Sequence, residues 1–165
     1  MRIFLATDDS KFSEAATRAV LAALDPKGAE VLVVRVLEPP AYTAIPEMRL
    51  PYAPELAALL DDQRKQANEC VANAAELLDR AGFRVDTRVV EGEARAVILA
   101  IAAEWKSDLI VVGSHGRKGL ERFLLGSVAE YVARHARCSV WIVRVSPGRP
   151  EGSTPQRTGE RGWGI

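Results

Sequence analysis

Residues 108–128, DLIVVGSHGRKGLERFLLGSV, join a short apolar strand to a glycine-punctuated loop and then to the start of a helix. The strand is Leu109–Val112, and the pair Gly126-Ser127 opens an apolar helical pattern. Glycines let backbone N–H groups approach an anion without interference from a Cβ atom, and a helix N-terminus adds partial positive charge. The run therefore predicts a phosphate-binding loop, although it contains neither G-x-x-x-x-G-K-[ST] nor G-x-G-x-x-G.

Strand and helix patterns alternate on both sides of this run. Residues 31–37 form a continuous β-branched stretch, typical of a strand buried on both faces of a parallel sheet. Residues 83–90 mostly alternate apolar and polar side chains, which indicates a half-exposed strand near a sheet edge. In full, the patterns predict strands at residues 2–6, 31–37, 83–90, 109–112 and 140–145, and helices at about 11–24, 54–80, 94–105 and 127–136.

This alternation predicts an α/β fold: a single Rossmann-like domain whose five-stranded parallel sheet has the order 3-2-1-4-5, with helices on both faces. We expect the domain to occupy residues 1–145 and the Gly-, Pro- and Arg-rich tail 146–165 to be disordered. Residues 38–54 hold five prolines and predict an irregular loop. In such a sheet, ligands bind beyond the carboxyl ends of the strands where the order reverses, so Thr7–Ser10 and Gly113–Ser127 should line one crevice.

Composition excludes several classes of function. Lysines plus arginines and aspartates plus glutamates number 22 each, so no basic excess suggests a nucleic acid or a membrane surface as partner. No apolar run approaches the roughly 20 residues of a membrane span, and no signal-peptide pattern precedes the first strand, so we expect a cytoplasmic protein. Cys70 and Cys138 have neither metal nor redox spacing, and Cys70 is interpreted as a small buried hydrophobe.

The glycine spacing resembles that of a known family. Gly113-Ser-His-Gly116, nine residues and then Gly126-Ser127 resemble the G-x-x-G-(nine)-G-[S/T] signature of the nucleotide-binding universal stress proteins. Residues 7–10, 91–92, 124–130 and 138–144 are also similar to that family, so the resemblance covers about residues 1–145. It implies an adenine nucleotide alpha hydrolase-like, Rossmann-like module. In the subset with this loop, the module binds ATP, with Mg²⁺ or Mn²⁺ accompanying, and is often a homodimer.

The resemblance also implies roles for individual residues. Asp8 would meet the ribose or a metal-bridged phosphate, and the final strand, Val140–Val145, would pair across a homodimer. The adenine would lie against Ala6, Thr7, Val36 and Val112, and the sugar and phosphates would contact Gly113, His115, Gly116, Gly126, Ser127 and Val128. Arg117 and Lys118 either contact the terminal phosphate or stay solvated. Two residues depart from the family pattern: Asp9 replaces a frequent glycine, which favours a metal-bound nucleotide, and Arg35 replaces a frequent histidine.

Other interpretations of these residues remain open. Asp8 and Asp9 also suit helix caps, His115 also suits a general base, and Ser127 suits a helix cap that binds phosphate as well. The sequence holds no nucleophile elbow, His/Cys metal cluster or Walker lysine. Three hypotheses follow: an ATP-binding regulatory module of the stress response, read by an unknown protein partner; a slow Mg²⁺-dependent ATPase or phosphotransferase; or a dimerisation module that binds no nucleotide. We favour the first.

Overall fold

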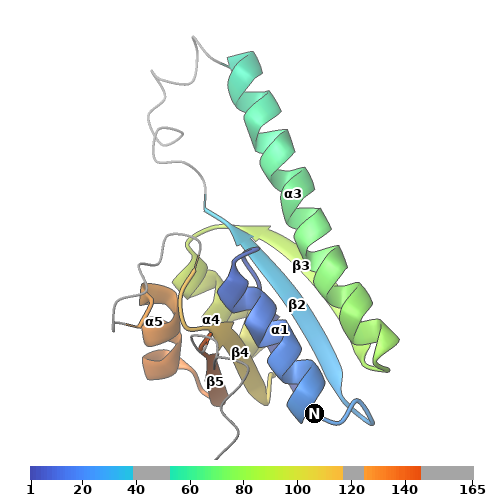
Figure 1. Cartoon of the computed structure of the whole chain (residues 1–165). Coiled ribbons are helices and arrows are strands. Elements are labelled where there is room, and N and C mark those ends of the chain that lie inside the picture. Colours follow the sequence, from blue (N-terminus) through green and yellow to red (C-terminus); the bar gives the residue numbers. More distant parts are fainter. Residues whose placement is uncertain (39–52, 117–124, 146–165) are drawn as a thin grey trace, which may run out of the picture.

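The computed structural model describes residues 1–38, 53–116 and 125–145 (Figure 1). Strands and helices alternate along these residues as the sequence predicts. The strands are β1 (Arg2–Ala6), β2 (Glu30–Leu37), β3 (Arg84–Glu91), β4 (Leu109–Gly113) and β5 (Ser139–Val143), and the helices are α1 (Lys11–Ala23), α3 (Ala53–Arg80), α4 (Ala94–Glu104) and α5 (Ser127–His135). The final strand thus begins one residue before the predicted Val140 and ends two residues before Val145. The predicted tail and most of the predicted loop 38–54 lie outside the described residues.

The strands form one parallel sheet in the order β3-β2-β1-β4-β5, which confirms the predicted topology. Ala6 lies opposite Val34 of β2, and Leu5 lies opposite Val111 of β4, so β1 sits between the two strands at the reversal of strand order. β3 forms one edge, as its alternating pattern predicts. Because all five strands run the same way, their carboxyl ends meet at a single edge of the sheet.

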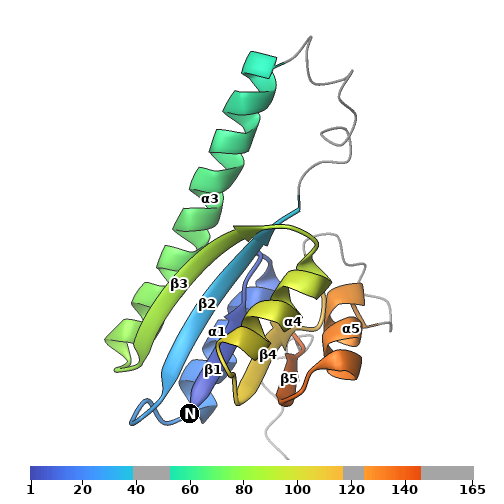
Figure 2. The same cartoon turned by 180° about the vertical axis from the view of Figure 1, so that it is seen from behind.

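Helices cover both faces of the sheet. α1 and α3 pack on one face against Ile3, Leu5, Val31 and Val33, and α4 and α5 pack on the other against Phe4, Leu32 and Val34 (Figures 1 and 2). These strand side chains are at most 1% exposed, so the apolar run of β2 is buried on both faces, as expected. The next residue of β2 on the α1–α3 face is Arg35, where an apolar side chain would continue the core.

The long helix α3 covers the sheet with only part of its length. Its buried side chains, Ala67, Cys70, Val71, Ala74 and Leu78, recur at three- and four-residue intervals. The earlier turns project beyond the carboxyl edge of the sheet, where Leu59 is 45% exposed (Figures 1 and 2). The helix ends before Gly82, whose φ of +93° suits glycine, and the Phe83 amide donates to the Leu78 carbonyl.

The last strand, β5, has apolar residues on both faces, as its alternation predicts. Val140 and Ile142 pack with the α4–α5 core, whereas Trp141 and Val143 pack with the α1–α3 core. Among the strands that the structure describes, β5 pairs with β4 alone and forms the second edge of the sheet. Among the residues that the structure describes, no helix combines the length and the apolar character needed to cross a membrane.

Candidate functional site

A pocket of about 780 Å³ opens at the carboxyl edge of the sheet, within the range of small-molecule sites. It lies where the order of strands reverses, between the ends of β1, β2 and β4 and the starts of α4 and α5. The predicted binding residues that the structure describes all line it: Ala6, Thr7, Asp8, Val36, Val112, Gly113, His115, Gly116, Gly126, Ser127 and Val128. The structure therefore brings these residues together around one space, while Arg117 and Lys118 lie outside the described residues.

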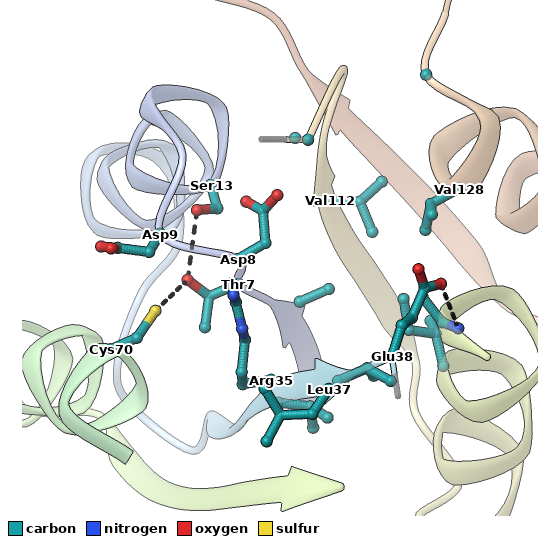
Figure 3. Close-up of a pocket in the computed structure, with 18 of the residues that line it drawn as sticks. Thr7, Asp8, Asp9, Ser13, Arg35, Leu37, Glu38, Cys70, Val112 and Val128 are labelled. Atoms are coloured by element: carbon teal, nitrogen blue, oxygen red, sulfur yellow. Dashed lines mark hydrogen bonds between the residues drawn. The ribbon is translucent and has the colours of Figure 1, made fainter. Parts of the chain in front are cut away.

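One wall of the pocket is apolar. Ala6, Val36, Val112 and Val128 belong to, or pack against, the core on the α4–α5 face, and they line the pocket with Ile98 of α4. At the rim of this wall, the backbone N–H of Ala94 donates to Glu38 Oε1 over 3.2 Å. Figure 3 shows Val112 and Val128 on the same side of the pocket as Glu38. A flat apolar ring can be buried against such a wall without leaving polar groups unpaired.

Asp8 stands between the apolar wall and the glycine loop. Its Oδ1 accepts hydrogen bonds from the Ser10 hydroxyl at 2.6 Å and from the Ser10 N–H at 3.2 Å. Ser10 in turn is the N-cap of α1, with its hydroxyl accepting from the Ser13 N–H. The interpretation of Asp8 or Asp9 as the cap is therefore wrong: Ser10 caps the helix, and Asp8 holds Ser10 in place.

The three glycines of the signature are required by close packing. A Cβ on Gly116 would lie 2.8 Å from Asp8 Oδ2, and one on Gly126 would lie 3.0 Å from the His115 Cα. A Cβ on Gly113 would lie 2.8 Å from the carbonyl carbon of Phe12 in α1. None of the three has a positive φ. Glycine is needed at these positions because neighbouring backbone atoms, or the Asp8 carboxylate, occupy the space of a Cβ atom. Without a Cβ, the backbone N–H groups of the loop are also easier for a ligand to approach.

The N-terminus of α5 opens into the pocket without a side-chain cap. Its N-cap is Gly126, which makes no side-chain cap hydrogen bond. By contrast, α1 is capped by Ser10 and α4 by Glu93. The expectation that Ser127 caps this helix is therefore wrong, because Ser127 is already the first helical residue. The N–H groups of the first turn of α5 can instead donate to an anion, with the positive end of the helix dipole behind them.

His115 is positioned by packing on two neighbours. Its ring lies 5.0 Å from the Phe12 ring, centroid to centroid, and its Nδ1 is 3.1 Å from the Ser114 hydroxyl. Ser114 is itself fixed, because its N–H donates to the Val143 carbonyl and its carbonyl accepts from the Gly126 N–H. The loop is therefore tied to both β5 and α5, and the backbone on either side of His115 has a defined position.

Asp9 adopts a left-handed backbone conformation, with a φ of +61°. This conformation is strained for residues with a Cβ and easy for glycine, although aspartate tolerates it better than most. The geometry therefore suits glycine better than aspartate at this position. Asp9 therefore places a second carboxylate at the pocket at some cost in stability.

We predict that Asp9→Gly raises the free energy of unfolding by about 0.5–1 kcal/mol, because relief of left-handed strain exceeds the added entropy of the unfolded chain. Urea denaturation measures the change. Lys106, with a φ of +54° and a place outside the pocket lining, gives the matched variant Lys106→Gly. Lys106→Gly should gain at least as much stability as Asp9→Gly, because lysine tolerates the left-handed conformation less well than aspartate. A loss of stability in Asp9→Gly alone would show that the carboxylate itself stabilises the protein.

The pocket also has a polar side that the sequence did not predict. On the α1–α3 face, the Thr7 hydroxyl lies 3.3 Å from Cys70 Sγ and donates to the Ser13 hydroxyl over 3.4 Å (Figure 3). Arg35 of β2 and Gln66 of α3 line the same side. Cys70 is buried, as predicted, at 8% exposure. The available signal for Arg35 was its charge within the otherwise apolar run of residues 31–37.

The described residues whose pKa values are clearly shifted do not line the pocket. A hydrogen bond from the Arg95 side chain holds the pKa of Glu93 below its usual value, and the ion pair raises the pKa of Arg95. Glu93 accepts from the N–H groups of Arg95 and Ala96, so its retained charge serves the N-terminus of α4. Burial raises the pKa of the Cys138 thiol. Within residues 1–38, 53–116 and 125–145, no three His, Cys, Asp or Glu side chains are grouped to hold a metal ion.

Comparisons of the sequence and of the fold with known proteins point to the same family. The model of the universal stress protein family matches residues 1–144. A universal stress protein of Methanocaldococcus jannaschii is 33% identical over 144 residues, which cover 87% of this chain and 81% of that protein. The structure of the universal stress protein UspA from Lactobacillus plantarum has a TM-score of 0.76 at 25% identity, over 87% of this chain and 97% of its own. The structure of a universal stress protein in complex with cAMP has a TM-score of 0.55 at 28% identity, over 88% of this chain and 98% of that chain. By sequence and by fold, the chain belongs to the universal stress protein family.

Proposed function

We propose that this protein binds an adenine nucleotide, with ATP as the favoured ligand, and acts as a nucleotide-dependent regulatory module of the stress response. One observation carries the proposal: the apolar wall and the uncapped N-terminus of α5 face the same pocket. A nucleotide has the matching pair of features, a flat base at one end and phosphates at the other. The shared pocket therefore suits the whole molecule better than either part alone.

The arrangement of side chains favours one orientation of the ligand. The base would lie against Ala6, Val36 and Val112, and the phosphates would meet the N–H groups of Ser127 and Val128 in the first turn of α5. Asp8, between these two ends, would bind the ribose or a Mg²⁺ or Mn²⁺ ion carried by the phosphates. A metal bound with the nucleotide would offset repulsion between the phosphates and the nearby carboxylate of Asp9.

A relative supports the ligand class. The universal stress protein in complex with cAMP is 28% identical to this chain and shares its fold over 88% of the chain. An adenine ring with a phosphate is therefore compatible with a close variant of this framework. The apolar wall would contact only the base, which AMP, cyclic AMP, ADP and ATP share. The phosphate end of the pocket would therefore select among these four nucleotides.

Bound nucleotide would act on other proteins by changing the surface that they contact. We infer a cytoplasmic homodimer in which the free edge of β5 pairs with a second copy, because an exposed strand with apolar residues on both faces is a template for strand pairing. His115 and Gly126 are tied to Val143 of β5 through Ser114. Nucleotide at the loop would therefore alter the edge that a second copy or another protein partner contacts.

The test is calorimetric titration of the full chain with adenosine, AMP, cyclic AMP, ATP and GTP, each with and without Mg²⁺. We expect adenine compounds to bind more tightly than GTP, and Mg²⁺ to strengthen the binding of ATP but not of adenosine. Equal binding of ATP and GTP would contradict selection of an adenine base by this pocket. Release of ADP during the ATP titration would indicate the slow hydrolysis that the sequence left open.

Asp8→Asn should weaken the binding of Mg-ATP about tenfold, the loss of one charge-assisted contact. The amide oxygen of asparagine can still accept from Ser10, so the cap of α1 should persist and the melting temperature should change little. Adenosine affinity measures the other end of the pocket and should change less than that of Mg-ATP. An equal loss for both ligands would instead show that Asp8 acts through the ribose.

A further inference from the structure

Arg35 is buried with unpaired hydrogen-bond donors. Arg35 is 7% exposed, and its Nε and Nη1 atoms are buried without a hydrogen-bond partner among residues 1–38, 53–116 and 125–145. Within the described parts of the chain it forms no ion pair either, whereas Arg64, Arg84 and Arg88 pair with glutamates at the surface. A buried guanidinium without partners is costly for a folded protein. Its retention here points to a partner that binds from outside.

The place of Arg35 separates it from the apolar wall. Side chains alternate along β2, so Val34 and Val36 face the α4–α5 side and Arg35 faces the α1–α3 side. Figure 3 shows the Arg35 side chain running from β2 toward Thr7, at the end of the pocket away from Val112 and Val128. The pocket therefore continues past the end of β1 into a polar compartment, which we call the Arg35 compartment: Thr7, Ser13, Arg35, Gln66 and Cys70.

The chemistry of this compartment fits an oxyanion. The guanidinium presents parallel N–H donors that match two oxygens of a phosphate or carboxylate. Gln66, an exposed residue of α3 at the same compartment, can add an amide donor. Four carboxylates of the described residues also line the pocket. Those of Asp9, Glu38 and Asp62 are exposed, where water screens their repulsion, and that of Asp8 is half-buried and accepts two hydrogen bonds from Ser10. The interaction with a buried guanidinium is screened less.

We propose that Arg35 anchors a second phosphate subsite, distinct from the N-terminus of α5. The phosphate group either belongs to a bound nucleotide, reaching the compartment across the end of β1, or is a free inorganic phosphate. In the first case the inference rests on the proposed function, and in the second it does not. In both cases the phosphate accepts hydrogen bonds from the same atoms, the Nε and Nη1 donors of Arg35, which donate to no described group of the protein.

The test uses the full chain and three variants. Arg35→Met keeps the length of the side chain and removes charge and donors, and Arg35→Lys keeps the charge but loses the paired donors. Arg88→Met is the matched control, since Arg88 lies on the adjacent strand β3, pairs with Glu104 and does not line the pocket. Calorimetry and thermal melting are followed with inorganic phosphate, adenosine, AMP and Mg-ATP as separate probes.

We expect Arg35→Met to raise the melting temperature of the ligand-free protein or leave it unchanged, because a buried unpaired charge is replaced by an apolar side chain. We expect it also to weaken phosphate binding about tenfold, with Arg35→Lys intermediate and Arg88→Met like wild type. A loss for inorganic phosphate identifies a free-anion subsite. A loss for Mg-ATP, with adenosine unchanged and inorganic phosphate inert, identifies the phosphate chain of the nucleotide.

One result would overturn the subsite: phosphate and Mg-ATP binding that is the same in Arg35→Met as in wild type. If the melting temperature of Arg35→Met without ligand is also lower, Arg35 serves the fold instead. The proposed function fails separately: it fails if no adenine compound binds wild type, even where inorganic phosphate binds through Arg35.

Discussion

Gly126→Leu is expected to abolish nucleotide binding while the protein stays folded. Gly126 is the N-cap of α5, and its Cβ position lies 3.0 Å from the Ser114 carbonyl oxygen and from the His115 Cα. A leucine there must displace the loop and place an isobutyl group beside the first turn of α5. The phosphates would then lose at least two charge-assisted hydrogen bonds, each worth roughly 1.5–3 kcal/mol. We expect the dissociation constant for Mg-ATP to rise about a hundredfold or more.

Calorimetric titration with Mg-ATP measures this effect, and circular dichroism with thermal melting checks the fold. The matched control is Ala133→Leu, which adds the same side chain to an exposed position of α5 that does not line the pocket. This control should bind like wild type. Wild-type affinity in a folded Gly126→Leu variant would show that the phosphates do not bind at the N-terminus of α5.

Gly113→Val should destabilise the whole domain rather than the ligand complex alone. A Cβ at Gly113 would lie 2.8 Å from the Phe12 carbonyl carbon and Cβ and 2.9 Å from the Phe12 carbonyl oxygen. These atoms belong mainly to the backbone of α1, so no change of rotamer can relieve the contact. β4 and α1 must move apart within a core where Val111 and Ala16 are fully buried. We expect the free energy of unfolding to fall by about 3 kcal/mol, the upper part of the usual cost of overpacking.

Urea denaturation of the ligand-free protein measures the change in the free energy of unfolding. Thr87→Val is the control, because it places the same β-branched residue at an exposed position of β3 that does not line the pocket. That variant should differ from wild type by less than about 0.5 kcal/mol. If Gly113→Val is as stable as wild type, α1 and β4 are packed less tightly than the structure has them.

The fold could be predicted because its signals are local and repeated. The run of residues 31–37, apolar except for Arg35, predicts a central strand, and the alternation over residues 83–90 predicts an edge strand. Helices between parallel strands then leave few topologies. The ends of elements depend on weaker interactions, which is why β5 begins and ends earlier than the pattern suggested.

The site could be predicted in part, and the missed features depend on contacts between distant residues. The glycine spacing and the similarity to universal stress proteins predicted a set of residues that do line one pocket. Sequence could not show that Gly126, rather than Ser127, is the N-cap of α5, because both residue types occur at that position. Nor could it show that Arg35 is buried with two donors unpaired among the described residues, since this depends on how α3 and β1 surround it.

The close packing of the glycines links the fold to the proposed function. Gly113 lets β4 approach α1, Gly116 lets the loop approach Asp8, and Gly126 lets α5 begin beside His115. The same contacts place backbone N–H groups, a carboxylate and a helix N-terminus around a single space. The pocket is therefore a consequence of how the carboxyl ends of β1 and β4 are connected to their helices.

The central claim is that this pocket binds an adenine nucleotide. The most direct test is to incubate purified full-length protein with a mixture of Mg-ATP and Mg-GTP, remove free nucleotide, quench in acid, and identify the released compound by chromatography and mass spectrometry. We predict near-stoichiometric adenine nucleotide from wild type and none from Gly126→Leu. No adenine nucleotide from wild type, or equal amounts from both proteins, would contradict the claim.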